Sequence, residues 1–333
     1  MTSLAQKIAG ALRLGRRRAP ASRRPQTTGS WSREAVLERV APLPLRDRFL
    51  PEFDPNYYRA LYPDLSQLDD EALEHHYRGT GRAEGRVASP LAARGYFVDA
   101  LQGGERSLEL GAFHRPLMRG AHTKHFDVLP RAQLVERAKA IGEKPEGIPE
   151  IDFVSPSGDL AVVDEPFDMI VSSHVIEHQP NLVAHLAHVE RILDKGGVYA
   201  MIVPDCRFCF DHFIPPSTLG QVIEAHHQNP KVHALRSVVE MRALTTHNDA
   251  ARHWKGDHGT LDHTVARTRN AIREWEQSKG SYIDVHAWRF TPDSFAQIIT
   301  TLNGLGMTGL TPYRIYPTPY LVSEFCAVLG KDS

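Results

Sequence analysis

From residue 106 onward, short apolar runs alternate with stretches of helical periodicity, and this alternation constrains the fold more than any other feature. Residues 167–172 contain an unbroken apolar run, which is typical of a strand buried on both faces of a parallel sheet. Residues 181–193 place apolar side chains at spacings of four, three and four on one helical face, at Leu182, Leu186, Val189 and Leu193. The alternation predicts an α/β fold whose parallel sheet is covered by helices on both faces.

The same pattern predicts seven strands in a Rossmann-like sheet. They are expected at about residues 107–110, 124–129, 150–154, 167–172, 198–203, 310–316 and 324–329. Helices are expected at residues 131–141, at 181–193 and from Thr291, which can cap a helix that has Pro292 in its first position. The last two strands follow one another without a helix between them.

The chain divides into three parts by composition. Residues 1–50 carry 11 Lys or Arg against 3 Asp or Glu and predict a flexible basic tail and linker. Residues 51–90 are rich in aromatic side chains and predict a small helical module, and residues 91–333 form the α/β domain. Beyond residue 50 there are 28 basic and 37 acidic side chains, so the folded body lacks the positive excess that nucleic-acid binding needs. No apolar run is long enough to span a bilayer, which leaves at most a peripheral membrane contact through the tail.

The module at residues 51–90 carries two recognisable phrases, FDPNYYRALYPDL and HHYRGTGRAEGR. They resemble a short module that accompanies bacterial glycosyltransferases and other surface-polysaccharide proteins. The resemblance covers about 35 residues and implies a possible glycosyltransferase partner without implying any chemistry. A helical hairpin that only packs on the next domain is the alternative interpretation.

Candidate ligand-binding residues follow the expected strands, because ligands of open parallel sheets bind beyond the carboxyl ends of the strands. Glu109 and Gly111 lie at the end of the first strand, and glycine lets a ligand approach the backbone. Asp127 comes sixteen residues after Gly111, near the end of the second strand, where a carboxylate can accept both hydroxyls of a ribose. After the third strand, Asp159 and Leu160 could border an adenine. Together these positions predict a nucleoside site.

Several longer phrases extend the pattern from Ser107 to about Lys331, among them SSHVIEHQPNL, VERILDKGGVYAMIVPD, RFCFDHFIPPSTLGQVIEAH and DVHAWRFTPDSF. They resemble a bacterial branch of the class I S-adenosylmethionine-dependent methyltransferases. The resemblance implies a seven-stranded sheet with an antiparallel last strand and S-adenosylmethionine as cofactor. It implies that Glu109 and Gly111 line the methionine and ribose side, that Asp127 holds the ribose and that Asp159 and Leu160 border adenine. It also implies that Ser173 and His174 lie close to the methionine and the transferred methyl group.

The first loop departs from the family pattern, since Gly111 is followed by Ala112, Phe113 and His114 instead of further glycines. The missing glycines are those that seat a pyrophosphate on a helix terminus, so a dinucleotide is disfavoured. A sulfonium cofactor has no phosphate and tolerates a bulkier loop. The departure also leaves open that cofactor binding has been lost.

Methyl transfer to a hydroxyl requires exclusion of water, alignment of the acceptor and one base. His174, directly after the fourth strand, is a candidate base, although it could instead bond to a neighbouring loop. His178 is expected to be structural because it precedes the start of a helix at about Pro180.

The interval at residues 206–288 is too long for a simple loop and predicts a helical lid that binds the acceptor. Its candidates for a polar pocket are His247, Asp249, His253, Asp257 and His258, with Trp254 or Trp288 as an apolar platform. Asp205, Arg207, Asp211, His212, Asp284 and His286 are expected to border the same cleft, and the candidate catalytic residues are His174, Asp205, Asp211, His258 and His286. Their spacing matches no strong metal motif, so no metal is assigned.

These observations predict a cytoplasmic enzyme that methylates a sugar hydroxyl of a surface polysaccharide or of its precursor. The cytoplasm is inferred from only three cysteines, of which Cys206 and Cys209 form a lone CxxC and are expected to be buried and inert. One alternative is a non-catalytic scaffold with a degenerate first loop that docks to a glycosyltransferase. A nucleotide-sugar oxidoreductase is the other alternative.

Overall fold

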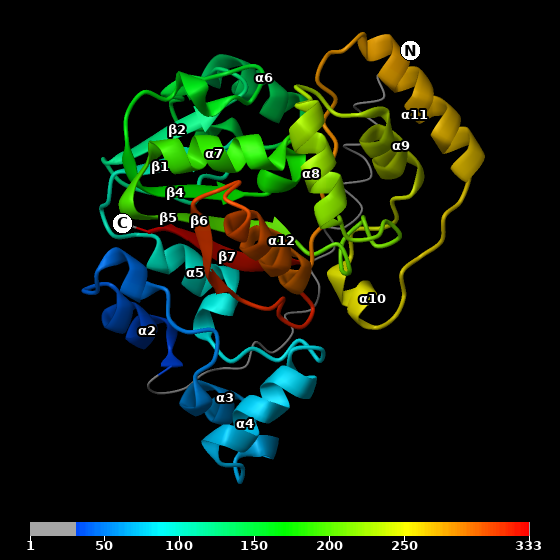
Figure 1. The fold of residues 1–333 in the computed structure, drawn as a ribbon. Helices are drawn as coiled ribbons and strands as arrows, with labels where there is room; N and C mark the ends of the chain where they lie inside the picture. The colour runs from blue at the N-terminus through cyan, green and yellow to red at the C-terminus, as the bar shows by residue number, and fades with distance from the viewer. Residues whose placement is uncertain (1–30, 333) are drawn as a thin grey trace.

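The computed structural model describes residues 31–332, and its centre is one seven-stranded sheet in the order β3-β2-β1-β4-β5-β7-β6 (Figure 1). This confirms the predicted fold class. The strands are β1 (Ser107–Leu110), β2 (Thr123–Asp127), β3 (Phe153–Val154), β4 (Phe167–Ser173), β5 (Leu193–Pro204), β6 (Leu310–Ile315) and β7 (Glu324–Lys331).

Strands β1 to β5 pair in parallel, whereas β7 lies antiparallel between β5 and β6. The register places Ser172 of β4 beside Leu110 on one side and Met201 on the other, so these three strands end together. Because β7 runs in the opposite direction, its first residue, Glu324, pairs with Pro204 at the same edge. The antiparallel strand therefore begins where the parallel strands end.

Helices cover both faces of the sheet. They are α2 (Arg33–Val40), α3 (Pro55–Leu61), α4 (Asp70–His76), α5 (Arg94–Ala100), α6 (Arg131–Ile141), α7 (Leu182–Ile192), α8 (Leu219–Gln228), α9 (Leu235–Ala243), α10 (Ala250–Trp254), α11 (Thr264–Ser278) and α12 (Pro292–Gly304). Asn181 caps α7 and Thr291 caps α12, which also has proline in its first turn as expected.

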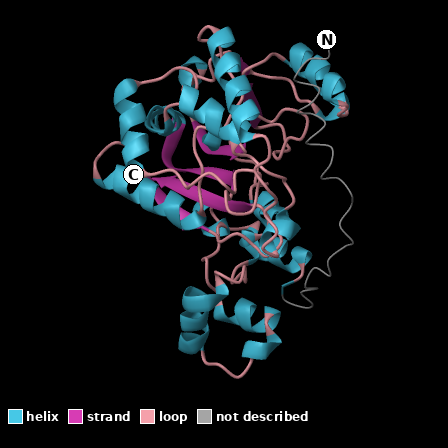
Figure 2. Ribbon diagram, turned by 90° about the vertical axis from the view of Figure 1, so that its right-hand side faces the viewer, coloured by secondary structure: helices cyan, strands magenta, loops and turns pink. Residues whose placement is uncertain are grey.

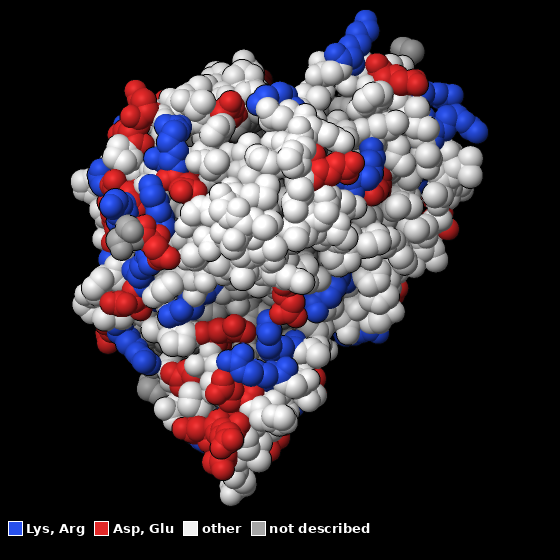
Figure 3. Space-filling model, in the orientation of Figure 1, with Lys and Arg blue, Asp and Glu red and all other residues white. Residues whose placement is uncertain are grey.

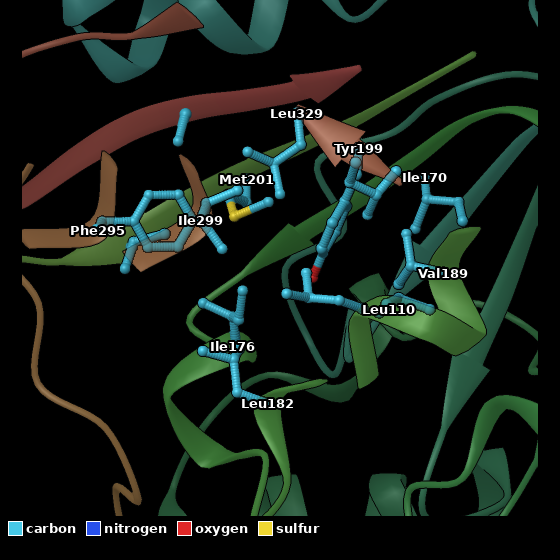
Figure 4. Close-up of a cluster of buried hydrophobic side chains, with 14 of the residues drawn as sticks. Leu110, Ile170, Ile176, Leu182, Val189, Tyr199, Met201, Phe295, Ile299 and Leu329 are labelled. Atoms are coloured by element: carbon cyan, nitrogen blue, oxygen red, sulfur yellow. The ribbon is translucent and has the colours of Figure 1, made fainter. Parts of the chain in front are cut away.

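Alternate residues of the central strands point to opposite faces of the sheet and belong to two different hydrophobic cores. Ile170 belongs to the core beneath α7 and α12, where Figure 4 shows it together with Tyr199, Val189 and Ile299. Met169 and Val171 point to the opposite face and join the core that contains Phe97 of α5. The period of two along a strand explains how an unbroken apolar run supplies both cores.

Residues 31–50 differ from the expected linker. Helix α2 is capped by Ser32, and Trp31, Val36 and Val40 are buried in the core beneath the sheet together with Phe49. This segment is part of the main body because its few apolar side chains recur on one helical face. The basic stretch at residues 1–30 lies outside the described residues.

Helices α3 and α4 form the small module, which protrudes from the body of the molecule (Figure 2). Its separate core consists of five buried residues, Tyr58, Leu65, Leu73, Tyr77 and Ala88. Figure 3 shows charges of both signs gathered on this module, whereas the surface over α8 and α12 carries few charges. No described helix is both long and apolar enough to cross a membrane.

The interval at residues 206–288 contains α8 to α11, as predicted for a helical insertion. Helices α9 and α11 pack around a small core that includes Val238 and Ala271. The insertion is tied to the main sheet at its end, where the indole Nε1 of Trp288 donates a 2.6 Å hydrogen bond to the carbonyl of Gln179. Trp288 is 1% exposed, so it is a core residue and not the expected platform for an acceptor.

Candidate active site

The strand order reverses between β1 and β4, and a cavity of about 130 Å³ opens at the carboxyl ends of these strands. Its lining residues are Arg94, Glu109, Gly111, Ala112, Phe113, His114, Arg115 and Ser173. Such a reversal is the usual position of a ligand crevice in an open parallel sheet. A wider depression of about 620 Å³ lies along α4 on the small module, where no strand ends. The cavity at the sheet is therefore the candidate site.

Gly111 has a φ of 67°, a conformation that favours glycine. A Cβ atom added there would approach the Val175 side chain to 3.0 Å, so the position also has little room. Phe113 has a φ of 43° without being glycine, which places a strained residue in the wall of the cavity. The connection from β1 to β2 contains no helix in the structure, although crossovers between parallel strands usually do.

Glu109 holds this helix-free connection in place through hydrogen bonds to its backbone. Its carboxylate is 2% exposed and accepts hydrogen bonds from the backbone N–H groups of Leu117 at 2.7 Å and Met118 at 3.0 Å. Burial raises the pKa of Glu109 to about 7, although the two backbone donors and the charge of Arg94 act in the opposite direction. Glu109 thus lines the cavity and also anchors the loop.

Asp127 ends β2 as predicted and is 6% exposed, but it is not among the residues that line the cavity. Its carboxylate accepts backbone hydrogen bonds from Leu129 and Val128, and from Phe113 in the first loop. Burial raises the pKa of Asp127, and these donors lower it. Phe113 lines the cavity, and its ring is packed beside α6 with Arg137 5.5 Å from its centre.

Asp159 and Leu160 do not line the cavity either. Asp159 caps a short helix by accepting from the N–H of Ala161, and it forms an ion pair with His188 at 3.0 Å. Leu160 is 1% exposed within the main core, and its carbonyl accepts from Arg191 at 2.8 Å. Both residues hold the turn after β3 in the present conformation.

Ser173 and His174 are brought together with two residues that the sequence analysis missed, Arg94 and Glu324. Arg94 donates to the Ser173 hydroxyl at 3.2 Å and to Glu324 at 3.1 Å, while Nε2 of His174 lies 2.7 Å from Glu324 Oε2. Burial lowers the pKa of His174, but the hydrogen bond to Glu324 and the charges of Glu177 and Glu324 outweigh this and raise it. Glu324 could have been anticipated, because an antiparallel last strand must begin at the edge where the others end.

A second group of side chains converges on the short helix Ile176–His178 that follows β4. His286 and Asp211 are both buried, and Nδ1 of the imidazole lies 2.5 Å from the carboxylate. The Nε2 atom of His286 lies 3.9 Å from Oε1 of Glu177, and Nδ1 of His174 lies 3.6 Å from the same oxygen. The structure thus joins three of the predicted catalytic residues around Glu177.

The other two predicted catalytic residues are engaged elsewhere. The buried Asp205 carboxylate binds the Arg207 guanidinium and accepts from the Thr318 hydroxyl at 2.6 Å, which leaves it a structural ion pair. His258 stacks on His212, with ring centres 3.6 Å apart, within the turn around α10. Other members of the expected polar pocket bind one another there: Asp249 caps α10, Arg252 pairs with Asp257, and His247 bonds the Asp257 carbonyl.

Residues 108–201, from β1 to β5, match a protein-family model described as a methyltransferase domain. This stretch of the chain is therefore similar to a methyltransferase domain. S-adenosylmethionine is the cofactor of this domain, and the candidate cavity lies where its strand order reverses.

Individual relatives of the domain are distant. A curated relative, the ubiquinone biosynthesis O-methyltransferase of Paramagnetospirillum magneticum, is 23% identical over 135 residues, which cover 39% of this chain and 43% of that protein. The match therefore spans less than half of the curated relative. Among solved structures, an S-adenosylmethionine-dependent methyltransferase from Clostridium acetobutylicum is 15% identical with a TM-score of 0.24 and covers 33% of this chain and 47% of that chain. One from Mesorhizobium loti is 14% identical with a TM-score of 0.34, covering 68% and 91%.

The lining residues suit the methionine end of this cofactor. Arg94 offers a guanidinium to a carboxylate, the buried Glu109 offers an acidic partner to a cationic group, and Gly111 leaves the backbone open. The cavity of about 130 Å³ is nevertheless small beside the roughly 300 to 1,000 Å³ of typical ligand sites. A nucleoside beside Asp127, as the sequence resemblance implies, would need more room than this cavity offers.

Proposed function

We propose that the protein transfers a methyl group from S-adenosylmethionine to a hydroxyl of a polyhydroxylated acceptor, a sugar of a surface polysaccharide or of its precursor. The observation that carries the proposal is the arrangement that follows β4. Ser173 lines the cavity, and the next residue, His174, lies 3.6 Å from the Glu177 carboxylate that also faces His286. A site for the methyl donor and a group of proton-accepting side chains are thus adjacent.

The chemistry needs few groups. The acceptor oxygen forms a bond to the methyl carbon, the carbon–sulfur bond breaks, and its electron pair remains on sulfur as a neutral thioether. The hydroxyl proton must leave, and the polar group around Glu177 provides the route. His286 is oriented by Asp211, an arrangement that holds an imidazole with its second nitrogen free for another partner. His174 is the weaker base, because its Nε2 atom is already bonded to Glu324.

The acceptor class has two supports. The curated relative is by name an O-methyltransferase, which favours oxygen as the methylated atom. The small module at residues 51–90 resembles a companion of glycosyltransferases, which favours a sugar acceptor and a glycosyltransferase partner. The largely uncharged surface over α8 and α12 offers nothing to a phosphate backbone, so that face is not proposed for nucleic acid (Figure 3).

The proposed location is the cytoplasm. Its support is that all three cysteines are free thiols and are buried. Burial raises the pKa values of Cys206 and Cys209, which fits inert core residues and not a redox pair.

The test combines binding with transfer. S-adenosylhomocysteine binding is measured by calorimetry, and transfer of a labelled methyl group is measured to nucleotide sugars, to polysaccharide fragments and to a catechol as a non-sugar hydroxyl. The proposal expects binding and labelled sugar. Label only on the catechol would refute the sugar acceptor, and binding without transfer to any of these hydroxyls would refute the reaction.

The non-catalytic scaffold remains the second candidate, because Asp127 is not among the residues that line the cavity. It predicts no binding of S-adenosylhomocysteine together with retention of a glycosyltransferase in a pull-down. Phe113→Ala separates the two candidates. A closed but functional site gains affinity for S-adenosylhomocysteine when the ring is removed, whereas a degenerate site still does not bind it.

A further inference from the structure

Glu177 is a buried carboxyl group without a hydrogen-bond partner among the described residues. The residue is 0% exposed, and neither oxygen of its carboxylate has a hydrogen-bond partner within the described residues 31–332. An ionised carboxylate that is buried without compensation is costly, by several kcal/mol even after relaxation of the surroundings. Because no described protein group donates a hydrogen bond to Glu177, its carboxylate is available to a ligand from outside the chain.

Three imidazoles face the unpartnered carboxylate. Nδ1 of His174 lies 3.6 Å from Oε1 of Glu177, but the Nε2 atom of that ring is bonded to Glu324. The Nε2 atoms of His178 and His286 each lie 3.9 Å from Oε1 of Glu177, which is too far for a hydrogen bond. One potential ligand atom from each residue lies within 4.8 Å of the other two. A tetrahedral ion with bonds of about 2.1 Å would set such atoms about 3.4 Å apart. The two separations of 3.9 Å exceed this value by about 0.5 Å, so the three side chains would move closer together around a bound ion.

The far nitrogen of each ring faces a second carboxylate. Nδ1 of His286 lies 2.5 Å from Asp211, and Nδ1 of His178 lies 3.2 Å from Asp284. Histidines that bind metals usually direct their other ring nitrogen to a carboxylate or carbonyl, which fixes the tautomer and the orientation of the ring. The His286 ring has this hydrogen-bonded support, whereas Nδ1 of His178 lies near Asp284 without the geometry of a hydrogen bond. In both rings the Nε2 atom faces Glu177.

The fold holds these segments together although 109 positions separate Glu177 from His286. The backbone carbonyl of Glu177 accepts from the N–H groups of Ala287 at 2.7 Å and Trp288 at 3.1 Å. The Trp288 indole then donates to Gln179. The three candidate ligands thus lie on two chain segments that these hydrogen bonds hold together, so the site is preorganised.

We propose that Glu177, His178 and His286 bind a divalent transition-metal ion. Two imidazoles and one carboxylate suit zinc, cobalt or iron better than magnesium or calcium, which prefer all-oxygen sites. Three protein ligands leave at least one coordination position open, as catalytic metal sites do.

The role of the ion rests on the proposed function, whereas its binding does not. A hydroxyl of the acceptor occupies the open position, where the metal lowers its pKa so that the proton is lost to solvent water. The resulting alkoxide oxygen attacks the methyl carbon, and sulfur leaves as the thioether. Glu177, His178 and His286 thereby become ligands instead of bases.

A second cluster of histidines provides the internal comparison. His212, His253 and His258 also bring three ring nitrogens close together, but they include no carboxylate. Their nitrogens already have partners: the Nδ1 atoms of His253 and His258 are 3.0 Å apart, and Nδ1 of His212 contacts the Arg207 carbonyl at 2.7 Å. The Nδ1 atoms of this cluster therefore have protein partners, and no ion is proposed there.

The test is titration of the full, chelator-treated chain with Co²⁺, followed by visible absorption and by calorimetry. The proposal expects one tightly bound Co²⁺ per chain, loss of affinity by a factor of more than about 100 in Glu177→Gln, and no change in His258→Ala. Asp211→Asn, which keeps the ligands but alters their support, should weaken Co²⁺ binding about 10- to 100-fold. Circular dichroism verifies that each variant is folded, and Asp211→Asn serves as the readout if Glu177→Gln is not.

The outcomes separate the two proposals. Absence of Co²⁺ binding by the wild type, or binding that His258→Ala abolishes and Glu177→Gln preserves, would overturn the metal site. Co²⁺ binding without methyl transfer would leave the site standing and overturn the proposed function. Methyl transfer that survives chelation, in a chain that does not bind Co²⁺, would do the reverse.

Discussion

Glu109 gives a prediction whose magnitude follows directly from the structure. Its carboxylate is 2% exposed, and burial raises its pKa from 4.5 to about 7. The unfolded chain therefore releases the proton near pH 4.5, while the folded chain holds it to about pH 7. Between these values the folded state binds more protons, so its stability falls as the pH rises. The shift of about 2.5 units corresponds to about 3 kcal/mol at 1.36 kcal/mol per unit.

Glu109→Gln removes the titration while keeping the shape of the side chain. We expect the free energy of unfolding of the wild type, minus that of the variant, to fall by about 3 kcal/mol between pH 4.5 and 7 and to stay level above pH 7. Urea unfolding followed by circular dichroism, at half-unit steps of pH, measures this difference. Glu136→Gln, on the exposed side of α6, controls for the removal of a surface carboxylate. A difference that is flat or rises over this interval would refute the burial of Glu109 as the source of the effect.

The remaining predictions concern the loop, the support of the site and the core. Phe113→Ala should raise the affinity for S-adenosylhomocysteine in calorimetry, since Phe113 lines the small cavity and removal of its ring enlarges the space; a loss of affinity would contradict this. Arg94→Ala should raise the pKa of His174 further in an NMR titration, because the positive charge of Arg94 opposes protonation of that imidazole; a lower pKa would contradict this. Ile170→Ala should cost about 2 to 5 kcal/mol in urea unfolding, because this fully buried side chain fills the main core, and a cost below 1 kcal/mol would contradict the packing.

Local patterns in the sequence predicted the sheet well. The apolar run at Met169 to Val171 and the spacing of Leu182, Leu186 and Val189 depend only on burial and on the periods of strands and helices. The same rules did not anticipate α2, because only Val36 and Val40 within it are buried. Whether so short an apolar face is buried depends on the sheet beneath it, which local composition does not describe.

The candidate site was less predictable, because it is assembled from distant segments. Gly111, Ser173 and His174 could be placed from the ends of their strands. Glu324 required the direction of the last strand, and the meeting of His286 with Glu177 required the path of the insertion. His178 was interpreted as structural from its position before a helix, since no sequence rule places a second histidine beside it.

The carboxylates at the ends of the strands show why Glu177 stands apart. Buried acids are tolerated when donors or cations surround them, and their surroundings therefore indicate what each one does. Glu109 accepts two backbone N–H groups, Asp127 accepts backbone N–H groups, Asp205 holds an arginine, and Asp211 holds His286. Each of these four carboxylates maintains the fold around the site. Glu177 alone among these five has no hydrogen bond to either oxygen. The imidazoles of His178 and His286 face it, which is the arrangement expected of a residue kept for a ligand from outside the chain.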